Sequence, residues 1–346
     1  MVSFRLGGTD GVSVEAAKWR WALGALGMDV TTVAGAGPVD HLLPGLAIDA
    51  AEPPSAAEID AALSEADLVV VENLCSLPLN PGAASRVANA LRGRPALLHH
   101  HDLPWERPHL AHHPAPPDDP AWAHVTISEQ GRTALAARGI DAVTVYNAFD
   151  TTVAPGRRLA TRAALGIDDG ARLVVQPTRA LLRKNIPAAL ALAEALHATY
   201  WLLGPAEDGF GPELDRLVAA ARCPVVHGWP AVRGWPDRRA LTVEDAYAAA
   251  DLVVLPSTWE GFGNPAVESA IHRRPLAVGP YPVARELAAF GFEWFPVDRA
   301  GAVARWLDHP DERLLERNRA VAERWFNLRD LPEKLAAVLE RVAVLR

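Results

Sequence analysis

Short apolar runs alternate with longer amphipathic stretches along the whole chain, a pattern typical of β-α units around parallel sheets. No short internal repeat or low-complexity tract interrupts this alternation. The expected strands are 2–6, 28–33, 67–71, 96–101, 124–127 and 142–146 in the first half, and 172–176, 199–203, 224–227, 251–255, 275–278 and 292–297 in the second. Two sets of six strands, in a chain of 346 residues, predict an α/β protein with two Rossmann-like domains.

The two sets of strands are separated near residue 150. Val143 and Val145 still alternate with polar positions, and the turn-rich segment 151–158 follows them. The sequence therefore predicts one domain over residues 1–150 and a second that begins at residue 151.

The most informative motif is a glycine-rich turn at residues 259–264, which follows the apolar run 251–256. Asn264 is a good helix N-cap and Pro265 a good first helical residue, so the free N–H groups of a helix should face the turn and attract an anion. Glu260 and Glu268 add two carboxylates beside this site. Because many α/β proteins contain a strand, a glycine turn and a capped helix, the turn alone could also be structural.

Two cations follow the expected strand 172–176. Arg179 and Lys184 stand near the start of the next helix, where positive charge is unfavourable against the helix dipole. We therefore interpret them as anion-binding residues rather than as solvated surface cations. Arg183 is adjacent and is an alternative to either one.

These motifs resemble those of the family 4 retaining glycosyltransferases of the GT-B fold. Glu260 and Glu268 match the family's E-x7-E signature, and Arg179 and Lys184 match its R-x4-K spacing. The helix 241–251, the strand 274–278 and the segment 145–150 also resemble their family counterparts, although Ala148 replaces a glycine. The resemblance implies two Rossmann-like domains that face each other across a cleft.

The domain limits follow from the same resemblance. Residues 324–327 and 331–344 resemble the family's final helix, which returns to the first domain. The implied acceptor-side domain is therefore 1–150 with about 328–346, and the implied nucleotide-sugar domain is 151–327.

The resemblance also implies roles for the residues of the second domain. Arg179 and Lys184 would hold the donor diphosphate and stabilise the leaving group in place of a metal, so that neither a metal nor a cofactor is needed. Glu268 would bind the ribose hydroxyls, and Glu260 would lie near the transferred sugar. The backbone N–H groups of Phe262, Gly263 and Asn264 would contact sugar hydroxyls. The donor is then a nucleoside diphosphate sugar, with UDP favoured over GDP, and the acceptor attacks from the front face with retention of configuration.

In the first domain, residues 6–13 resemble the family's glycine-rich loop, with a helix expected to begin near Ser13. Gly11 would let the backbone approach the donor and the acceptor. The loop lacks the G-x-G-x-x-G pattern that a dinucleotide requires, which argues against an oxidoreductase. The remaining alternatives to transfer are a GT-B nucleotide-sugar epimerase or hydrolase, and a noncatalytic nucleotide-sugar-binding protein.

Six histidines fall within the fifteen residues 99–113. Alternation along a strand puts His99 and His101 on one face and His100 on the other. The family places a histidine at this strand end, so we expect His101, or else His100, to contact the donor sugar. The following residues Asp102, Trp105 and Glu106 are then expected to bind the acceptor. A metal site is the alternative, and we expect none here because no cysteine joins the histidines and the loop is rich in proline.

Charge and composition narrow the choice of partners. Residues 1–150 carry 9 basic and 18 acidic side chains, a net charge of −9, whereas residues 151–346 carry 25 and 24. Such an acidic first domain disfavours nucleic acid and a stable association with an anionic membrane, and we expect a small, soluble, polyhydroxylated or cationic acceptor. The absence of a signal peptide and of a long apolar run predicts a cytoplasmic protein. Cys75 and Cys223 are expected to be buried free thiols.

Overall fold

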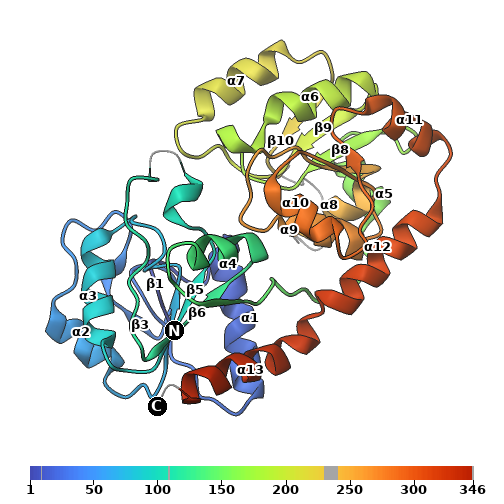
Figure 1. Cartoon of the computed structure of the whole chain (residues 1–346). Coiled ribbons are helices and arrows are strands. Elements are labelled where there is room, and N and C mark those ends of the chain that lie inside the picture. The colour runs from blue at the N-terminus through green and yellow to red at the C-terminus, as the bar shows by residue number, and fades with distance from the viewer. Residues whose placement is uncertain (9, 108–109, 230–240, 345–346) are drawn as a thin grey trace. The chain divides into compact units, whose positions relative to one another are not determined.

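The computed structural model describes residues 1–8, 10–107, 110–229 and 241–344. Thr9 of the glycine-rich loop and His109 of the histidine-rich segment lie outside these residues. The chain divides into two units, the first made of Met1–Ala148 and Leu328–Arg346 and the second of Phe149–Asn327 (Figure 1).

The first unit is built on a parallel sheet in the order β3-β2-β1-β4-β5-β6-β7. Every expected strand is present, and all are shorter than their apolar runs except β6, which begins two residues before the expected 124–127 and is one residue longer. The strand β3 was not expected, because its two residues are exposed and show no alternation. The strands are β1 Val2–Ser3, β2 Val33–Ala34, β3 His41–Leu42, β4 Val69–Glu72, β5 Ala96–His100, β6 Trp122–Thr126 and β7 Ala142–Thr144.

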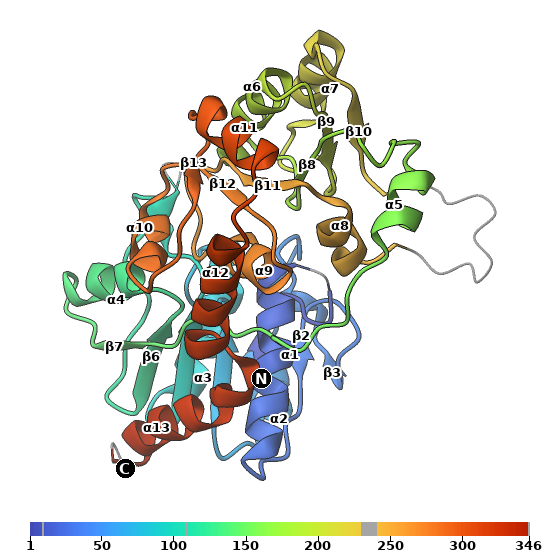
Figure 2. The same ribbon diagram turned by 90° about the vertical axis from the view of Figure 1, so that its right-hand side faces the viewer.

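Helices cover both faces of this sheet. Val69 and Val71 of β4 pack with α2 and α3, whereas Val70 between them packs with α1 and α13. The helix α13 comes from the C-terminal segment and lies against α1 (Figure 2). The helices of this unit are α1 Gly11–Ala25, α2 Ala56–Leu63, α3 Pro81–Leu91, α4 Glu129–Ala136 and α13 Leu331–Val344, with short 3-10 turns η1 Pro44–Leu46, η2 Pro104–Glu106 and η4 Leu328–Asp330.

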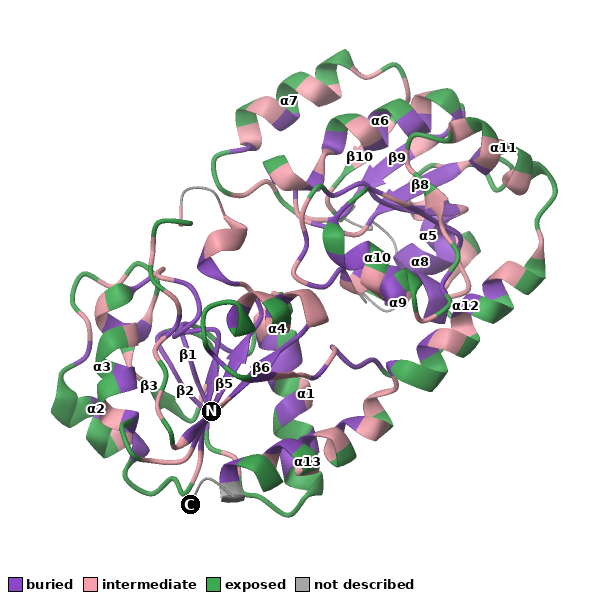
Figure 3. Ribbon diagram, viewed as in Figure 1, coloured by how far each residue is buried: buried purple, intermediate pink, exposed green. Residues whose placement is uncertain are grey.

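The second unit repeats the plan with a parallel sheet in the order β10-β9-β8-β11-β12-β13. The central strands of both sheets consist of buried residues (Figure 3). The strands are β8 Leu173–Gln176, β9 Thr199–Leu202, β10 Val225–His227, β11 Leu252–Leu255, β12 Leu276–Val278 and β13 Phe295–Pro296. The helices are α5 Arg158–Ala164, η3 Leu182–Lys184, α6 Ile186–Ala195, α7 Gly211–Ala220, α8 Val243–Ala249, α9 Asn264–Ile271, α10 Pro282–Ala288, α11 Ala300–Asp308 and α12 Glu312–Trp325.

Both sheets have the doubly wound order, and in both the direction of strand addition reverses once. The reversal lies between β1 and β4 in the first unit and between β8 and β11 in the second. Ligands of open α/β sheets bind beyond the carboxyl ends of the strands at such a point. The segments that follow β1 and β4 in the first unit, and β8 and β11 in the second, therefore lie at these points.

The structure also bears on the expected lack of a membrane span and on the state of the two cysteines. Among the residues described, no helix is both long and apolar enough to cross a membrane. Both cysteines are free, as expected, and Cys75 is buried. The expectation that Cys223 is also buried was wrong, because this residue comes just before the edge strand β10, where it is partly exposed.

The packing of α13 gives a stability prediction. Leu335 is fully buried in the same core as Trp19 and Val125. We expect Leu335→Ala to lower the free energy of unfolding of the first unit by about 2 to 5 kcal/mol, because the substitution removes buried methyl groups and leaves a cavity. Urea unfolding followed by circular dichroism measures this. The exposed Glu340→Ala on the same helix is the control, and equal stability of the two variants would contradict the packing.

Candidate functional site

A buried carboxylate with two cations occupies the switch point of the second unit. Glu260, in the loop after β11, accepts hydrogen bonds from Lys184 Nζ at 2.5 Å and from Arg183 Nη1 at 3.0 Å. Ser257 Oγ donates to the same carboxylate at 2.5 Å. Lys184 ends the turn η3 after β8, so the chain segments that follow both switch-point strands meet at this pair.

The charges at this point depend on one another. Burial would raise the pKa of Glu260, but the charges of Lys184 and Arg183 and the hydrogen bonds from Lys184 and Ser257 lower it overall. Burial lowers the pKa of Lys184, and the attraction of Glu260 offsets only part of this effect. Lys184 is 7 % exposed, so it is not the solvated surface cation that was the alternative interpretation.

Arg179 has a different partner. Its Nη1 donates to Glu207 at 2.6 Å, and both side chains are partly exposed. The charge of Arg179 still acts on Lys184. The two residues of the R-x4-K spacing therefore belong to one cationic region, but here each is paired with its own carboxylate.

The helix after the turn begins one residue earlier than expected. Gly263, not Asn264, is the N-cap of α9, and Asn264 is its first residue. Gly263 has a φ of 98°, and a Cβ there would lie 2.3 Å from the Tyr281 hydroxyl oxygen, so only glycine fits. The expected cap was wrong because this left-handed turn depends on a tyrosine that is distant in the sequence.

The other predicted donor-binding residues lie around this turn. Phe262 is buried, and its ring stacks on that of Phe149 with centroids 6.1 Å apart, so the backbone N–H is the part of this residue suited to a ligand. Glu268, on α9, accepts a 2.6 Å hydrogen bond from the hydroxyl of Tyr247, which is fully buried on α8. Tyr247 was not singled out from the sequence, although it is the one aromatic residue in the alanine-rich helix 241–251.

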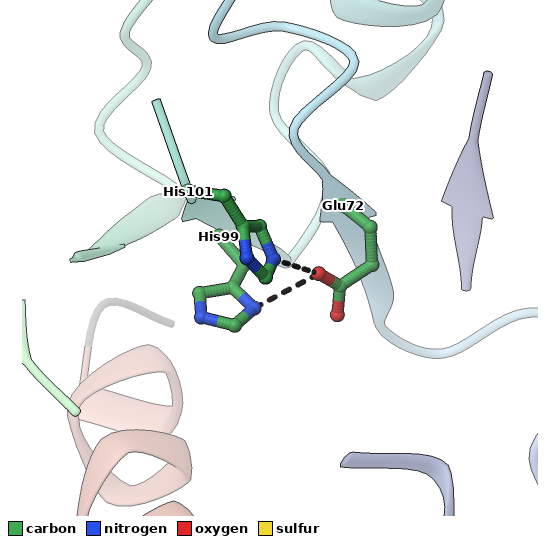
Figure 4. Close-up of side chains that lie close together, drawn as sticks. All are labelled: Glu72, His99 and His101. Carbon is green, nitrogen blue, oxygen red and sulfur yellow. Dashed lines mark hydrogen bonds and ion pairs between the residues drawn. The ribbon is translucent and has the colours of Figure 1, made fainter. Parts of the chain in front are cut away.

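The switch point of the first unit holds a second buried carboxylate (Figure 4). Glu72, the last residue of β4, stands opposite His99 of β5 in the parallel register. Its Oε2 lies 2.9 Å from His99 Nδ1 and 2.8 Å from His101 Nε2. All three side chains are buried, and the ring of His99 stacks on Trp19 with centroids 4.0 Å apart. His99 and His101 share one face of the strand, as the alternation predicted.

The sequence did not identify Glu72, because the expected strand ended at Val71. A carboxylate directly after a run of four apolar residues was the available signal. Glu72, His99 and His101 offer one ligand atom each within 4.8 Å of one another, a group that could hold a metal ion. The expectation of a metal-free protein stays a prediction.

His100 faces the other side of β5. Its Nδ1 lies 2.6 Å from Ser76 Oγ, and its Nε2 lies 2.9 Å from Nδ1 of His124. His124 Nε2 in turn bonds Asp118 at 3.0 Å. His100 and His101 therefore belong to separate networks, and of these two candidates His101 is the one that bonds Glu72 at the switch point.

The predicted acceptor residues have local partners in the loop after β5. Asp102 accepts from Arg107 at 3.3 Å, and Glu106 accepts from the backbone N–H of Leu103 at 2.9 Å. The ring of Trp105 lies under the guanidinium of Arg138, 3.6 Å away. These contacts hold the loop, and the structure leaves their acceptor role untested.

The glycine-rich loop leads into α1 earlier than expected. Asp10 is the N-cap and accepts from the backbone N–H of Ser13 at 3.2 Å, so the helix begins at Gly11 rather than near Ser13. A Cβ at Gly11 would meet no described atom within 4 Å, so the packing of the chain does not require glycine there.

Two sequences of stated activity are similar to this chain. The mannosylglucosylglycerate synthase of Petrotoga mobilis is 23 % identical over 366 aligned positions, which cover 85 % of each protein. The synthase of the same name from Thermotoga maritima is 26 % identical over 293 positions, covering 75 % of this chain and 68 % of that protein. No family model matches the chain.

Solved structures share the fold at low identity. HepE of Anabaena, in complex with UDP-glucose, superimposes with a TM-score of 0.73 at 20 % identity and covers 99 % of this chain and 100 % of its own. Sucrose-phosphate synthase of Thermosynechococcus elongatus gives a TM-score of 0.73 at 15 % identity, with 99 % and 96 % covered. The glycosyltransferase WaaG gives 0.67 at 15 %, with 98 % and 99 % covered. The expected GT-B fold is confirmed.

The His100 network generates a prediction about acid stability. Burial lowers the pKa of His100 and of His124, so both are neutral in the folded chain at pH values where an unfolded histidine binds a proton. Their contribution to stability is complete above about pH 6.5 and is lost as the pH falls below it. Urea unfolding measured between pH 8 and pH 5 should show that the free energy of unfolding falls less steeply with pH in His124→Gln than in the wild type. The exposed His309→Gln should follow the wild type, and a parallel decline in all three proteins would contradict the assignment.

Proposed function

We propose that this chain, a glycosyltransferase of the GT-B fold related to retaining family 4, moves a hexosyl group from a nucleoside diphosphate sugar to a hydroxyl of a small soluble acceptor. The observation that carries this proposal is the buried Lys184–Glu260 pair at the switch point of the second unit, beside the N-terminus of α9. That point is where an open α/β sheet binds a ligand, and the helix N-terminus favours an anion.

The donor diphosphate fits the cationic region around Lys184. Lys184, Arg183 and Arg179 supply positive charge, and the first N–H groups of α9 supply dipoles. Glu268, held by Tyr247, is suited to accept hydrogen bonds from the ribose. We favour a UDP-sugar over a GDP-sugar, in line with the UDP-glucose in the HepE complex.

Leaving-group stabilisation is the main chemical task of this site. As the anomeric C–O bond breaks, negative charge grows on the departing phosphate oxygen, and fixed cations stabilise it without a metal. The acceptor attacks from the same face, and its proton passes to the departing oxygen, so that the configuration is retained. Glu260 already accepts from two cations and a hydroxyl, which suits a positioning role better than nucleophilic attack.

The acceptor is proposed to be small, soluble and polyhydroxylated. The two similar synthases are named for mannosylglucosylglycerate, a small glycoside with a carboxylate. The net charge of −9 over residues 1–150 disfavours an anionic membrane surface, and the proposed place of action is the cytoplasm.

Acceptor-dependent release of nucleotide tests the proposed reaction. UDP-glucose and GDP-mannose are incubated with the enzyme, with and without glucosylglycerate or a panel of small polyols, and each reaction is run both with EDTA and with added magnesium. Transfer predicts that one donor releases nucleotide faster with an acceptor and that EDTA does not reduce the rate. Release that ignores every acceptor would identify a hydrolase or epimerase, and binding without release would identify a noncatalytic protein.

The donor site gives a binding prediction. Loss of one charge-assisted contact costs about 1.5 to 3 kcal/mol, so Lys184→Ala should weaken nucleoside diphosphate binding at least about tenfold. Isothermal titration calorimetry with UDP and GDP in EDTA measures this, and circular dichroism verifies that the variant is folded. The exposed Arg216→Ala, which removes a cation elsewhere in the same unit, is the control and should bind as the wild type does. Equal affinity of the Lys184 variant and the control would refute the assignment.

A further inference from the structure

Gln176, the last residue of β8, is a polar side chain that the proposed reaction does not yet use. It is fully buried, and it shares a face of the strand with Val174, which packs in the apolar core of the second unit. An amide in such a place is destabilising unless its hydrogen bonds are made. The partners of Gln176 therefore indicate why the chain places an amide here.

The chain at each end of the R-x4-K spacing contacts this amide. Nε2 of Gln176 donates to the backbone carbonyl of Lys184 at 3.1 Å and to Thr178 Oγ1 at 3.1 Å. Thr178 Oγ1 in turn donates to the carbonyl of Arg179 at 3.2 Å. One amide group thus joins the start of segment 178–184 to its end.

A third hydrogen bond fixes the orientation of the amide. The Tyr200 hydroxyl, on the neighbouring strand β9, donates to Gln176 Oε1 at 2.7 Å. Tyr200 is fully buried, and burial raises the pKa of its hydroxyl, so that the hydroxyl keeps its proton and acts as the donor. Because Oε1 is the atom that accepts from Tyr200, the hydrogens of Nε2 face Thr178 and Lys184.

Backbone contacts hold segment 178–184 from two further directions. The N–H of Gly204, in the loop after β9, donates to the carbonyl of Thr178 at 3.0 Å. The N–H of Thr258, in the loop after β11, donates to the carbonyl of Arg183 at 2.9 Å. The segment is therefore tied to both neighbouring loops, and the bond from Gln176 closes it on itself.

We propose that Gln176 is a positioning residue whose amide closes segment 178–184 and sets Lys184 for the donor diphosphate before the nucleotide binds. Lys184 is then held at both ends, its carbonyl by Gln176 at 3.1 Å and its Nζ by Glu260 at 2.5 Å. Tyr200 acts through Gln176 by fixing the orientation of the amide. The proposal rests on the transferase function given above. Such preorganisation favours binding, because the segment does not have to be ordered when the diphosphate arrives.

Hydrogen–deuterium exchange of the full chain without nucleotide measures how firmly the segment is held. The backbone N–H groups of Lys184 and Asn185 bond the carbonyls of Leu181 and Leu182. We expect a peptide that covers these residues to exchange about fivefold faster in Gln176→Leu than in the wild type, because the loss of one hydrogen bond favours local opening. A peptide from α12 should exchange at the same rate in both proteins.

Nucleotide affinity tests whether this order serves the diphosphate. Calorimetric titrations compare UDP with UMP and GDP with GMP. We expect Gln176→Leu to weaken diphosphate binding about tenfold and monophosphate binding less than about threefold, because the monophosphate lacks the phosphate next to the sugar. Tyr200→Phe should give a smaller loss in the same direction. Val174→Ala in the same strand is the matched control, which lowers the stability in urea but should leave both affinities unchanged.

Replacement of both partners separates positioning from stability. Tyr200→Phe leaves Gln176 Oε1 without its partner, and Gln176→Leu leaves the Tyr200 hydroxyl without one. Removal of both polar groups is less destabilising than leaving either one buried and unpaired. We therefore expect the double variant to resist urea at least as well as Gln176→Leu, yet to bind the diphosphate as weakly as Gln176→Leu does.

Three results would overturn the proposal. The first is a folded Gln176→Leu with the exchange rate and the diphosphate affinity of the wild type. The second is an equal loss of affinity for diphosphate and monophosphate, and the third is an affinity that recovers with stability in the double variant; either indicates a purely structural role. If Gln176→Leu does not fold, Tyr200→Phe carries the same comparison. If the wild type binds neither UDP nor GDP while exchange is faster in Gln176→Leu, the donor assignment fails and the closure of the segment stands.

Discussion

The constraint on which both switch points depend is the cost of burying a carboxylate. Glu72 and Glu260 are both buried in the protein interior. An unpaired charge in such a place would destabilise the fold by several kcal/mol. Each is therefore surrounded by nitrogen donors, His99 and His101 in one unit and Lys184 with Arg183 in the other. These donors are fixed in position by the carboxylate before any ligand arrives, which is the preorganisation that electrostatic catalysis requires.

The sheets explain why the carboxylates lie where they do. Both sheets have the doubly wound order, and the chain diverges at the carboxyl ends of two neighbouring strands. Glu72 is the last residue of β4, next to β1, and Glu260 follows β11, next to β8. The hydrophobic alternation that builds the strands thus determines which polar side chains meet at their ends.

Much of this arrangement could be predicted from the sequence. Apolar runs located twelve of the thirteen strands of the described residues, and the glycine turn with Glu260 and Glu268 marked the important loop. What could not be predicted depends on contacts between distant residues. Lys184 and Glu260 are 76 positions apart, and Tyr281 determines the conformation of Gly263 from beyond the next strand. Glu72 was missed because its partner His101 is 29 positions away and the expected strand ended at Val71, one residue before it.

The central claim is that the cations held by Glu260 form the donor diphosphate site. A crystal structure of the full chain with a bound nucleoside diphosphate tests it most directly. The account predicts phosphate oxygens within about 2.7 to 3.2 Å of Lys184 Nζ, with the N-terminus of α9 directed at the diphosphate. A nucleotide bound elsewhere, with the Lys184–Glu260 pair intact and no phosphate near it, would contradict the account.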